Sequence, residues 1–202
     1  MIDTCLAMNR LGINQGTAGN ASVRVPEGLL ITPSGLAYDR MKPEDIVTID
    51  KDGDTRGNGT PSSEWRFHFD IMVTRQDAQA VLHAHPPFCT ALACLGMDIP
   101  AFHYMVAVAG GDSIRCAPYA TFGTQALSDN ALRALDGRRA CLLANHGMIC
   151  LAGGLKAALR LAVEVETLAQ QYWRALLIGT PRILPADEMK TVLEKFRTYG
   201  KR

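Results

Sequence analysis

The run Val81-Leu82-His83-Ala84-His85-Pro86 is short and apolar and carries two histidines one residue apart. If residues 80–84 form an extended strand, side chains at positions i and i+2 leave the same face, so both imidazoles point to one place. Imidazole nitrogen is a common ligand for zinc, and a catalytic zinc site usually has three protein ligands. The run therefore predicts half of a metal site, with a structural histidine pair as the alternative for the pattern taken alone.

Three other histidines are candidates for the missing ligand. His68 lies inside a predicted helix, and His103 precedes Tyr104 in a predicted loop. His146 ends a second strand-like run and is followed by Gly147, which lets the backbone turn sharply or approach a neighbouring segment closely. We therefore expect His146 to complete the site.

Length, charge and cysteine content bound the class of protein. The 202 residues fit one domain spanning 1–202, and with 21 basic and 20 acidic residues no basic stripe indicates a nucleic-acid partner. The N-terminus has no signal-peptide pattern and no apolar run is long enough to span a bilayer, so we expect a cytoplasmic protein without a membrane partner. The six cysteines lack a Cys-x-x-Cys pair, and we expect them to be free thiols.

Small residues gather in two loops before the histidine run. Residues 14–20 and 32–35 are rich in Gly, Ser, Thr and Asn, a composition that leaves backbone N–H groups free to face an anion. A third such segment, Pro61-Ser62-Ser63-Glu64, opens a predicted helix over 65–75 with Ser62 or Ser63 as its cap. A helix N-terminus with serines suits phosphate. The alternative for the loops is that they are ordinary turns. The alternative for Glu64 is that its carboxylate only complements the dipole in the first turn of the helix.

The rest of the chain alternates short strands with helices. We expect strands over 22–25, 29–32, 46–50, 102–109, 114–118, 141–144 and 148–151, and helices over 2–11, 86–94, 124–135, 155–177 and 185–199. Residues 52–60 are expected to form a solvated turn. This irregular alternation predicts an α/β protein with a mixed or largely antiparallel sheet covered by helices.

Several motifs, taken together and in this order, resemble the class II aldolase/adducin family. They are Asn14-Gln15-Gly16-Thr17-Ala18-Gly19-Asn20, Ile31-Thr32-Pro33-Ser34-Gly35, Pro61-Ser62-Ser63-Glu64-Trp65-Arg66-Phe67-His68, His83-Ala84-His85, Ala117-Pro118-Tyr119-Ala120-Thr121-Phe122-Gly123-Thr124, Asn145-His146-Gly147 and Glu194-Lys195-Phe196-Arg197-Thr198-Tyr199-Gly200. The resemblance implies a three-layer α/β/α sandwich with a central, largely antiparallel sheet. It also implies a homotetramer with active sites at subunit interfaces.

The resemblance further implies an activity and a set of site residues. The activity is zinc-dependent cleavage of L-fuculose 1-phosphate, or a related deoxyketose 1-phosphate, to dihydroxyacetone phosphate and L-lactaldehyde. One Zn²⁺ per subunit would be bound by His83, His85 and His146, with Glu64 as a fourth ligand and as the catalytic acid/base. The implied substrate and phosphate contacts are Gly19, Asn20, Ser34, Gly35, Ser62 and Ser63. The resemblance also implies that Tyr104 acts as a catalytic residue from a neighbouring subunit. It implies that Phe122 and Tyr199 position the aldehyde.

Two other classes of function use the same scaffold. A sugar-phosphate 4-epimerase or a methylthioribulose-1-phosphate dehydratase would share the metal and phosphate loops, and would differ at the aldehyde end. An adducin-like interaction module would bind no metal. The presence of all three histidines together with Glu64 favours an enzyme over such a module.

Overall fold

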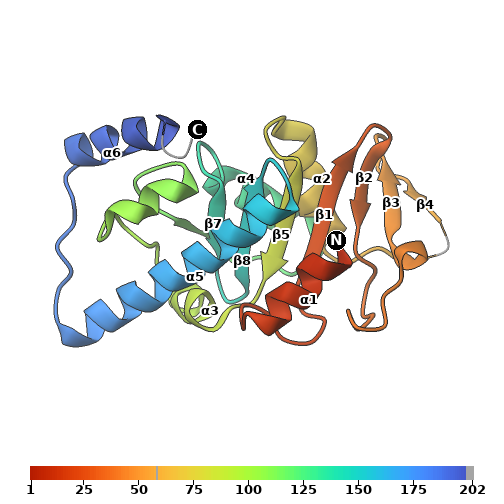
Figure 1. Ribbon diagram of the computed structural model, residues 1–202, viewed down its shortest axis with the longest axis horizontal. Coiled ribbons are helices and arrows are strands. Elements are labelled where there is room, and N and C mark those ends of the chain that lie inside the picture. Colours follow the sequence, from red (N-terminus) through yellow and green to blue (C-terminus); the bar gives the residue numbers. More distant parts are fainter. Residues whose placement is uncertain (58, 199–202) are drawn as a thin grey trace.

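A computed structural model describes residues 1–57 and 59–198 of the chain. Its centre is one sheet of eight strands (Figure 1). In spatial order the strands are β4 (Thr55–Arg56), β3 (Val47–Asp50), β2 (Gly28–Ile31), β1 (Asn20–Val25), β5 (Ala80–Ala84), β8 (Gly147–Ala152), β7 (Ala140–Leu143) and β6 (Arg115–Ala117). Every neighbouring pair is antiparallel except β6 with β7, which confirms the largely antiparallel sheet.

Helices cover both faces of this sheet. The long helix α5 (Leu155–Ile178) crosses one face together with α1 (Ile2–Arg10) and α3 (Pro87–Cys94) (Figure 1). Helices α2 (Trp65–Thr74) and α4 (Gln125–Ala134) pack on the opposite face. The three-layer α/β/α arrangement predicted above is therefore confirmed.

Strand β5 lies near the centre of the sheet and is buried throughout. Leu82 faces the core beneath α5, whereas Val81 faces the core beneath α2 and α4. His83 shares the face of Val81, because alternate side chains of a strand point the same way, and its ring meets Phe67 of α2 edge-on at a centroid distance of 5.5 Å. The period-two pattern thus directs His83 towards the N-terminal end of α2.

Two predicted segments are wrong. The expected strand over 102–109 is a 3₁₀ helix, η2 (Tyr104–Ala109), which His103 opens by accepting the N–H of Met105 and which Gly110 closes at a φ of 95°. A short apolar run does not distinguish helix from strand by its periodicity. The expected turn over 52–60 contains the edge strand β4, whose two residues are both exposed and so carry no apolar pattern.

The last helix of the described residues is α6 (Ala186–Thr198), which packs on η2 through a small apolar cluster that includes Met189 and Val192. A short 3₁₀ turn, η1 (Pro43–Asp45), precedes β3.

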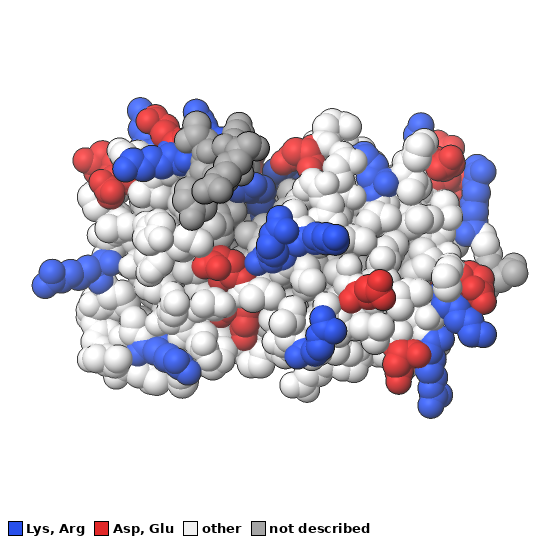
Figure 2. Space-filling model, in the orientation of Figure 1, with Lys and Arg blue, Asp and Glu red and all other residues white. Residues whose placement is uncertain are grey.

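All six cysteines lie in the described part of the chain and are free thiols, as expected. Acidic and basic side chains are interspersed over the face in Figure 2. Within residues 1–57 and 59–198, no helix is long and apolar enough to cross a membrane.

Candidate metal centre

Four side chains from three separate parts of the chain converge at one end of β5. His83 is on β5, His85 follows the strand directly, His146 lies in the turn between β7 and β8, and Glu64 is the residue before α2. One ligand atom from each lies within 4.8 Å of the others. The structure therefore brings together the four residues for which a metal role was expected, although they are separated by up to 82 positions in sequence (146 − 64).

The three imidazoles form a nearly equilateral triangle. Their ring centroids are 4.8 Å apart for His83 and His85, 4.7 Å for His83 and His146, and 4.9 Å for His85 and His146. Nδ1 of His83 lies 2.9 Å from the carbonyl oxygen of Met148, to which it donates. That bond places a proton on Nδ1 and leaves Nε2 to face the centre of the triangle.

A glycine permits the close approach of the two strands that carry the ligands. Gly147 begins β8, and a Cβ built there would lie 2.4 Å from the Ala84 carbonyl oxygen and 2.7 Å from Cδ2 of His85. The preceding Asn145 adopts a φ of 55°, a left-handed conformation that Asn tolerates better than most residues. The turn is therefore tight enough to place His146 against the end of β5.

Glu64 is buried, and its carboxylate faces two of the imidazoles. Oε2 lies 3.1 Å from Nε2 of His83, and Oε1 lies 3.1 Å from Nε2 of His146. Burial raises the pKa of Glu64, but the charges and hydrogen bonds of His83 and His146 outweigh that effect and leave the pKa well below its ordinary value. Glu64 is therefore ionised at neutral pH.

The donor set fits a divalent cation. Burial, and then the charges of His83 and His146, lower the pKa of His85 to about 4, so this imidazole is neutral at pH 7. Apart from the His146 imidazole 3.1 Å away, no polar group of the described residues reaches the buried Oε1 of Glu64. A buried carboxylate beside three converging imidazole nitrogens is the arrangement that a zinc-type ion satisfies.

Asn20 approaches the carboxylate from the neighbouring strand. Asn20 on β1 is the register partner of His83 on β5, and its Nδ2 donates to Oε2 of Glu64 at 3.1 Å. Behind it lie His68 and Ser22, which sequence reasoning did not identify as site residues. The available signal was a histidine four residues after Glu64, one helical turn further along a helix whose start faces the metal site.

Two of the small-residue loops are paired by backbone hydrogen bonds just before Glu64. Ser62 donates its N–H to the Thr32 carbonyl at 3.0 Å, and Ser34 donates its N–H to the Thr60 carbonyl at 3.0 Å, so these two loops are paired. Ser34, Gly35 and Ser63 are exposed. Contrary to expectation, neither serine caps α2, since Glu64 occupies the N-cap position and donates its own N–H to Ser62 Oγ.

Gly19 is held against the histidine strand. A Cβ at this position would lie 2.6 Å from the His83 carbonyl oxygen, so only glycine fits without displacing the backbone. The buried hydroxyl of Tyr38 donates to the Gly19 carbonyl. The loop that ends at Gly19 is therefore fixed relative to His83.

Phe122 lies at the site, whereas Tyr104 does not line it within one chain. A cavity of about 320 Å³ is lined by residues that include Ser63, Glu64, His85, Phe122 and His146.

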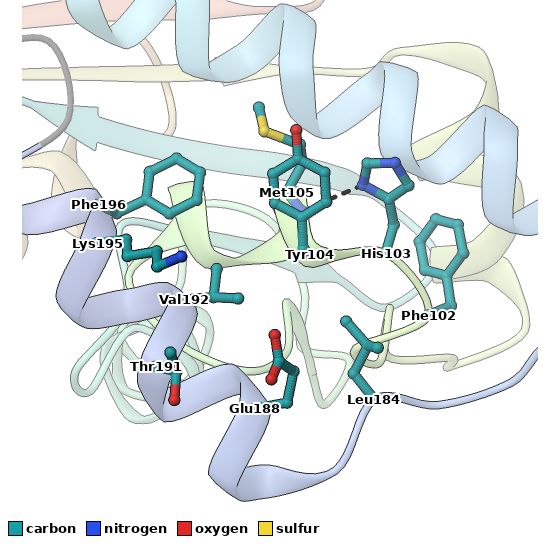
Figure 3. Close-up of a pocket in the computed structure, with 10 residues that line it drawn as sticks. All are labelled: Phe102, His103, Tyr104, Met105, Leu184, Glu188, Thr191, Val192, Lys195 and Phe196. Carbon is teal, nitrogen blue, oxygen red and sulfur yellow. Dashed lines mark hydrogen bonds between the residues drawn. The ribbon is translucent and has the colours of Figure 1, made fainter.

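Tyr104 instead lines a separate cavity of about 680 Å³ between η2 and α6 (Figure 3). There its ring faces Phe196 at a centroid distance of 6.5 Å. Tyr199 lies outside the described residues.

Comparison with known proteins places this site in a family. The family model for the Class II Aldolase and Adducin N-terminal domain matches residues 1–173. The chain is 62% identical over 200 residues to a 5-methylthioribulose-1-phosphate/5-deoxyribulose-1-phosphate aldolase of Rhodospirillum rubrum, covering 99% of this chain and 90% of the relative. It is 53% identical over 203 residues to L-fuculose phosphate aldolase of Escherichia coli K12, covering 100% and 94%.

Solved structures agree with the sequence relatives. An L-fuculose 1-phosphate aldolase structure superposes with a TM-score of 0.94 at 43% identity, covering 97% of this chain and 93% of that one. The fold, the family match and the named relatives are consistent with the convergence of Glu64 with His83, His85 and His146. The chain belongs to the class II aldolase and adducin family, and it is a class II aldolase.

Proposed function

We propose that this single-domain chain is a zinc-dependent aldolase that reversibly cleaves a deoxyketose 1-phosphate to dihydroxyacetone phosphate and a short aldehyde. The observation that carries the proposal is the convergence of Glu64, His83, His85 and His146 beside a cavity of about 320 Å³. When bound there by the three histidines, the cation would supply Lewis-acid stabilisation of the negative charge that cleavage leaves on the sugar oxygens.

Glu64 is the proposed acid/base. Cleavage breaks the C3–C4 bond of the ketose, and C3 must then gain a proton to give dihydroxyacetone phosphate. Glu64 is ionised, is buried beside the imidazoles and lines the cavity, so it can take a proton from C3 of dihydroxyacetone phosphate once the substrate displaces its contacts with His83 and His146. In the cleavage direction the protonated carboxyl group returns that proton to C3, which balances the proton that the C4 hydroxyl loses.

The proton on the C4 hydroxyl must leave as C4 becomes the aldehyde. We assign this transfer to Tyr104 of a neighbouring subunit, because Tyr104 of the same chain lines a different cavity and is half exposed there. The assignment requires an oligomer, and we propose a homotetramer with active sites at subunit interfaces. Tyr199 and Phe122 would position the aldehyde.

The paired loops are the proposed phosphate site. Ser34, Gly35 and Ser63 are exposed, Ser63 lines the cavity, and Ser62 joins the two loops through its N–H bond to Thr32. Backbone N–H groups and hydroxyls at the start of a helix bind phosphate well. Gly19 and Asn20 complete the proposed set of substrate contacts.

Two deoxyketose 1-phosphates compete as substrate. L-Fuculose 1-phosphate would release L-lactaldehyde, and 5-deoxyribulose 1-phosphate, or its methylthio analogue, would release an aldehyde without the hydroxyl. The 62% identity to the Rhodospirillum rubrum relative favours the five-carbon sugars over the 53% relatives named for fuculose phosphate. Ala18, Ala120 and Phe122 give the cavity an apolar wall, which suits the terminal methyl group that both sugars carry.

The test is a triose-phosphate-coupled assay on zinc-loaded enzyme with L-fuculose 1-phosphate, 5-deoxyribulose 1-phosphate and 5-methylthioribulose 1-phosphate. We expect triose phosphate from at least one of them, and the highest kcat/KM assigns the substrate. Epimerisation or loss of water without triose phosphate would assign one of the sister activities instead. A chain purified without chelators that contains no metal and does not respond to zinc would favour the adducin-like module.

A further inference from the structure

Three buried polar side chains form a chain of contacts behind Glu64. Ser22 and His68 are fully buried, and Asn20 is 4% exposed. Ser22 Oγ lies 2.7 Å from Nδ1 of His68, and Nε2 of His68 lies 2.5 Å from Oδ1 of Asn20. Asn20 Nδ2 then donates to Oε2 of Glu64 at 3.1 Å.

One arrangement of protons satisfies all three contacts. An ionised carboxylate only accepts hydrogen bonds, so Asn20 must present its NH₂ group to Glu64 and its carbonyl oxygen to His68. His68 must then donate from Nε2, which leaves Nδ1 to accept the hydroxyl proton of Ser22. Each hydrogen bond from Ser22 to His68 to Asn20 to Glu64 is therefore donated in the direction of Glu64.

His68 is suited to this arrangement because it stays neutral. Burial, followed by the charge of His83, lowers the pKa of His68 to about 3. The stacked ring of Phe67, at a centroid distance of 4.7 Å, lies against one face of the imidazole. A neutral ring with a single proton has one donor and one acceptor, which matches the Asn20 carbonyl and the Ser22 hydroxyl.

These hydrogen bonds determine which carboxylate oxygen of Glu64 is held in place. Oε2 accepts from Asn20 and faces His83, whereas Oε1 faces only His146 among the described residues. Rotation of the carboxylate would separate Asn20 from its acceptor and leave a buried amide unpaired, which is unfavourable. Partners of this kind behind a metal ligand orient it and affect the affinity for the metal.

We propose that His68 is a positioning residue for Glu64 that acts through Asn20, with Ser22 holding the far side of its ring. The inference rests on the proposed role of Glu64 as a zinc ligand and acid/base. His68 lies outside the ligand cluster. A substitution of His68, which would touch neither metal nor substrate, should therefore impair both zinc affinity and proton exchange.

The test compares two substitutions of His68 with a matched control. His68→Met keeps a similar length without a donor, and His68→Gln places an amide N–H near the position of Nε2. Ile71→Val is a buried change on the same helix that leaves the chain of contacts intact. Zinc affinity is measured by chelator competition, and exchange at C3 of dihydroxyacetone phosphate is measured in heavy water.

We expect His68→Met to weaken zinc affinity by about 10–100-fold and to lower the exchange kcat by a similar factor, with KM within about twofold. His68→Gln should recover most of both losses, and Ile71→Val should match wild type. Wild-type zinc affinity and exchange in folded His68→Met would overturn the inference, as would equal impairment of the Met and Gln variants. If His68→Met does not fold, Ser22→Ala takes its place. Wild-type zinc affinity in Ser22→Ala would then overturn the inference.

The two arms separate this inference from the proposed function. Zinc affinity requires no substrate, so it decides the role of His68 even if the wild-type protein cleaves none of the three ketose phosphates. In that case the proposed function fails and the inference stands or falls on affinity alone. An active wild type with an equally active, equally metal-retentive His68→Met variant would reject only the inference.

Discussion

Asn20 and His83 are direct partners across the antiparallel pair β1–β5, and both reach the same oxygen of Glu64. The Asn20 amide nitrogen and the His83 Nε2 each lie 3.1 Å from Oε2. The register of one strand pair therefore decides the surroundings of the carboxylate that we assign to proton transfer. A one-residue slip would turn either side chain to the other face of the sheet.

Glu64→Gln tests the acid/base assignment. The change preserves shape and leaves the three imidazoles in place, so zinc should stay bound. Proton exchange at C3 of dihydroxyacetone phosphate should fall by about 10²–10⁴-fold, because a general acid/base contributes a factor of that size. The exchange is followed by NMR in heavy water, and a variant that exchanges as fast as wild type would remove Glu64 from this role.

Gly147→Ala tests whether close strand approach builds the metal site. The new methyl group would lie 2.4 Å from the Ala84 carbonyl oxygen and 2.7 Å from the ring of His85, so the backbone or His85 must move. We expect at least tenfold weaker zinc affinity by chelator competition. Gly153→Ala, at a glycine of the loop after β8 where a Cβ meets nothing within 4 Å, is the control and should bind zinc as wild type does. Equal zinc affinity in the two variants would contradict this account.

Glu166 on α5 anchors the helix that follows His85. Its carboxylate accepts the N–H groups of Phe88 at 2.9 Å and Cys89 at 2.8 Å, which are free donors in the first turn of α3. Removing the carboxylate in Glu166→Ala should cost about 1–3 kcal/mol of unfolding free energy in urea, because two partly buried donors lose their partner. Glu164→Ala, two residues earlier on the same helix, is the control and should change the free energy of unfolding by less than about 0.5 kcal/mol. A Glu166→Ala variant as stable as the Glu164→Ala control would be the contrary result.

The buried histidines predict acid sensitivity of the metal-free protein. The folded-state pKa of His68 is lowered to about 3, against about 6.5 in the unfolded chain. The unfolded state therefore binds the proton first, and stability present above pH 6.5 is lost as the pH falls towards 3. At pH 5 this histidine alone should cost about 2 kcal/mol relative to pH 7. Urea titrations should show a smaller loss for His68→Met, and an equal loss in both proteins would exclude His68 as the cause.

Subunit mixing tests where Tyr104 acts. Tyr104→Phe and Glu64→Gln should each have little activity alone. If Tyr104 serves the site of a neighbouring subunit, co-expression of the two variants should produce mixed oligomers in which some sites receive both Glu64 and Tyr104, so that part of the wild-type activity returns. Mixed oligomers as inactive as both parents would place Tyr104 elsewhere. Light scattering on the same samples gives the number of subunits.

The ligand cluster could be predicted from sequence because its residues follow local rules. The i, i+2 spacing of His83 and His85 places both on one face of a strand, and Gly147 after His146 indicates a tight turn. Recognition of the family then linked these to Glu64. The structure confirms that all four converge, and their role as metal ligands stays a prediction that the assays above test.

Other features depend on contacts that no local pattern encodes. The apolar residues of η2 have the composition of a strand, and only their packing against α5 and α6 selects the 3₁₀ helix. His68 is one more residue on the buried face of a helix until the structure places Asn20 and Ser22 of another element against its two nitrogens. The direction of hydrogen bonds towards Glu64 is therefore a property of the fold.

The most direct test of the central claim measures metal and activity in one preparation. Protein purified without chelators is analysed for metal content and assayed for triose phosphate release from the best of the three ketose 1-phosphates, before and after chelation. The account predicts about one zinc-type ion per chain, loss of activity when that ion is removed, and recovery when zinc is added back. A folded, metal-free protein that releases triose phosphate at the original rate would contradict it.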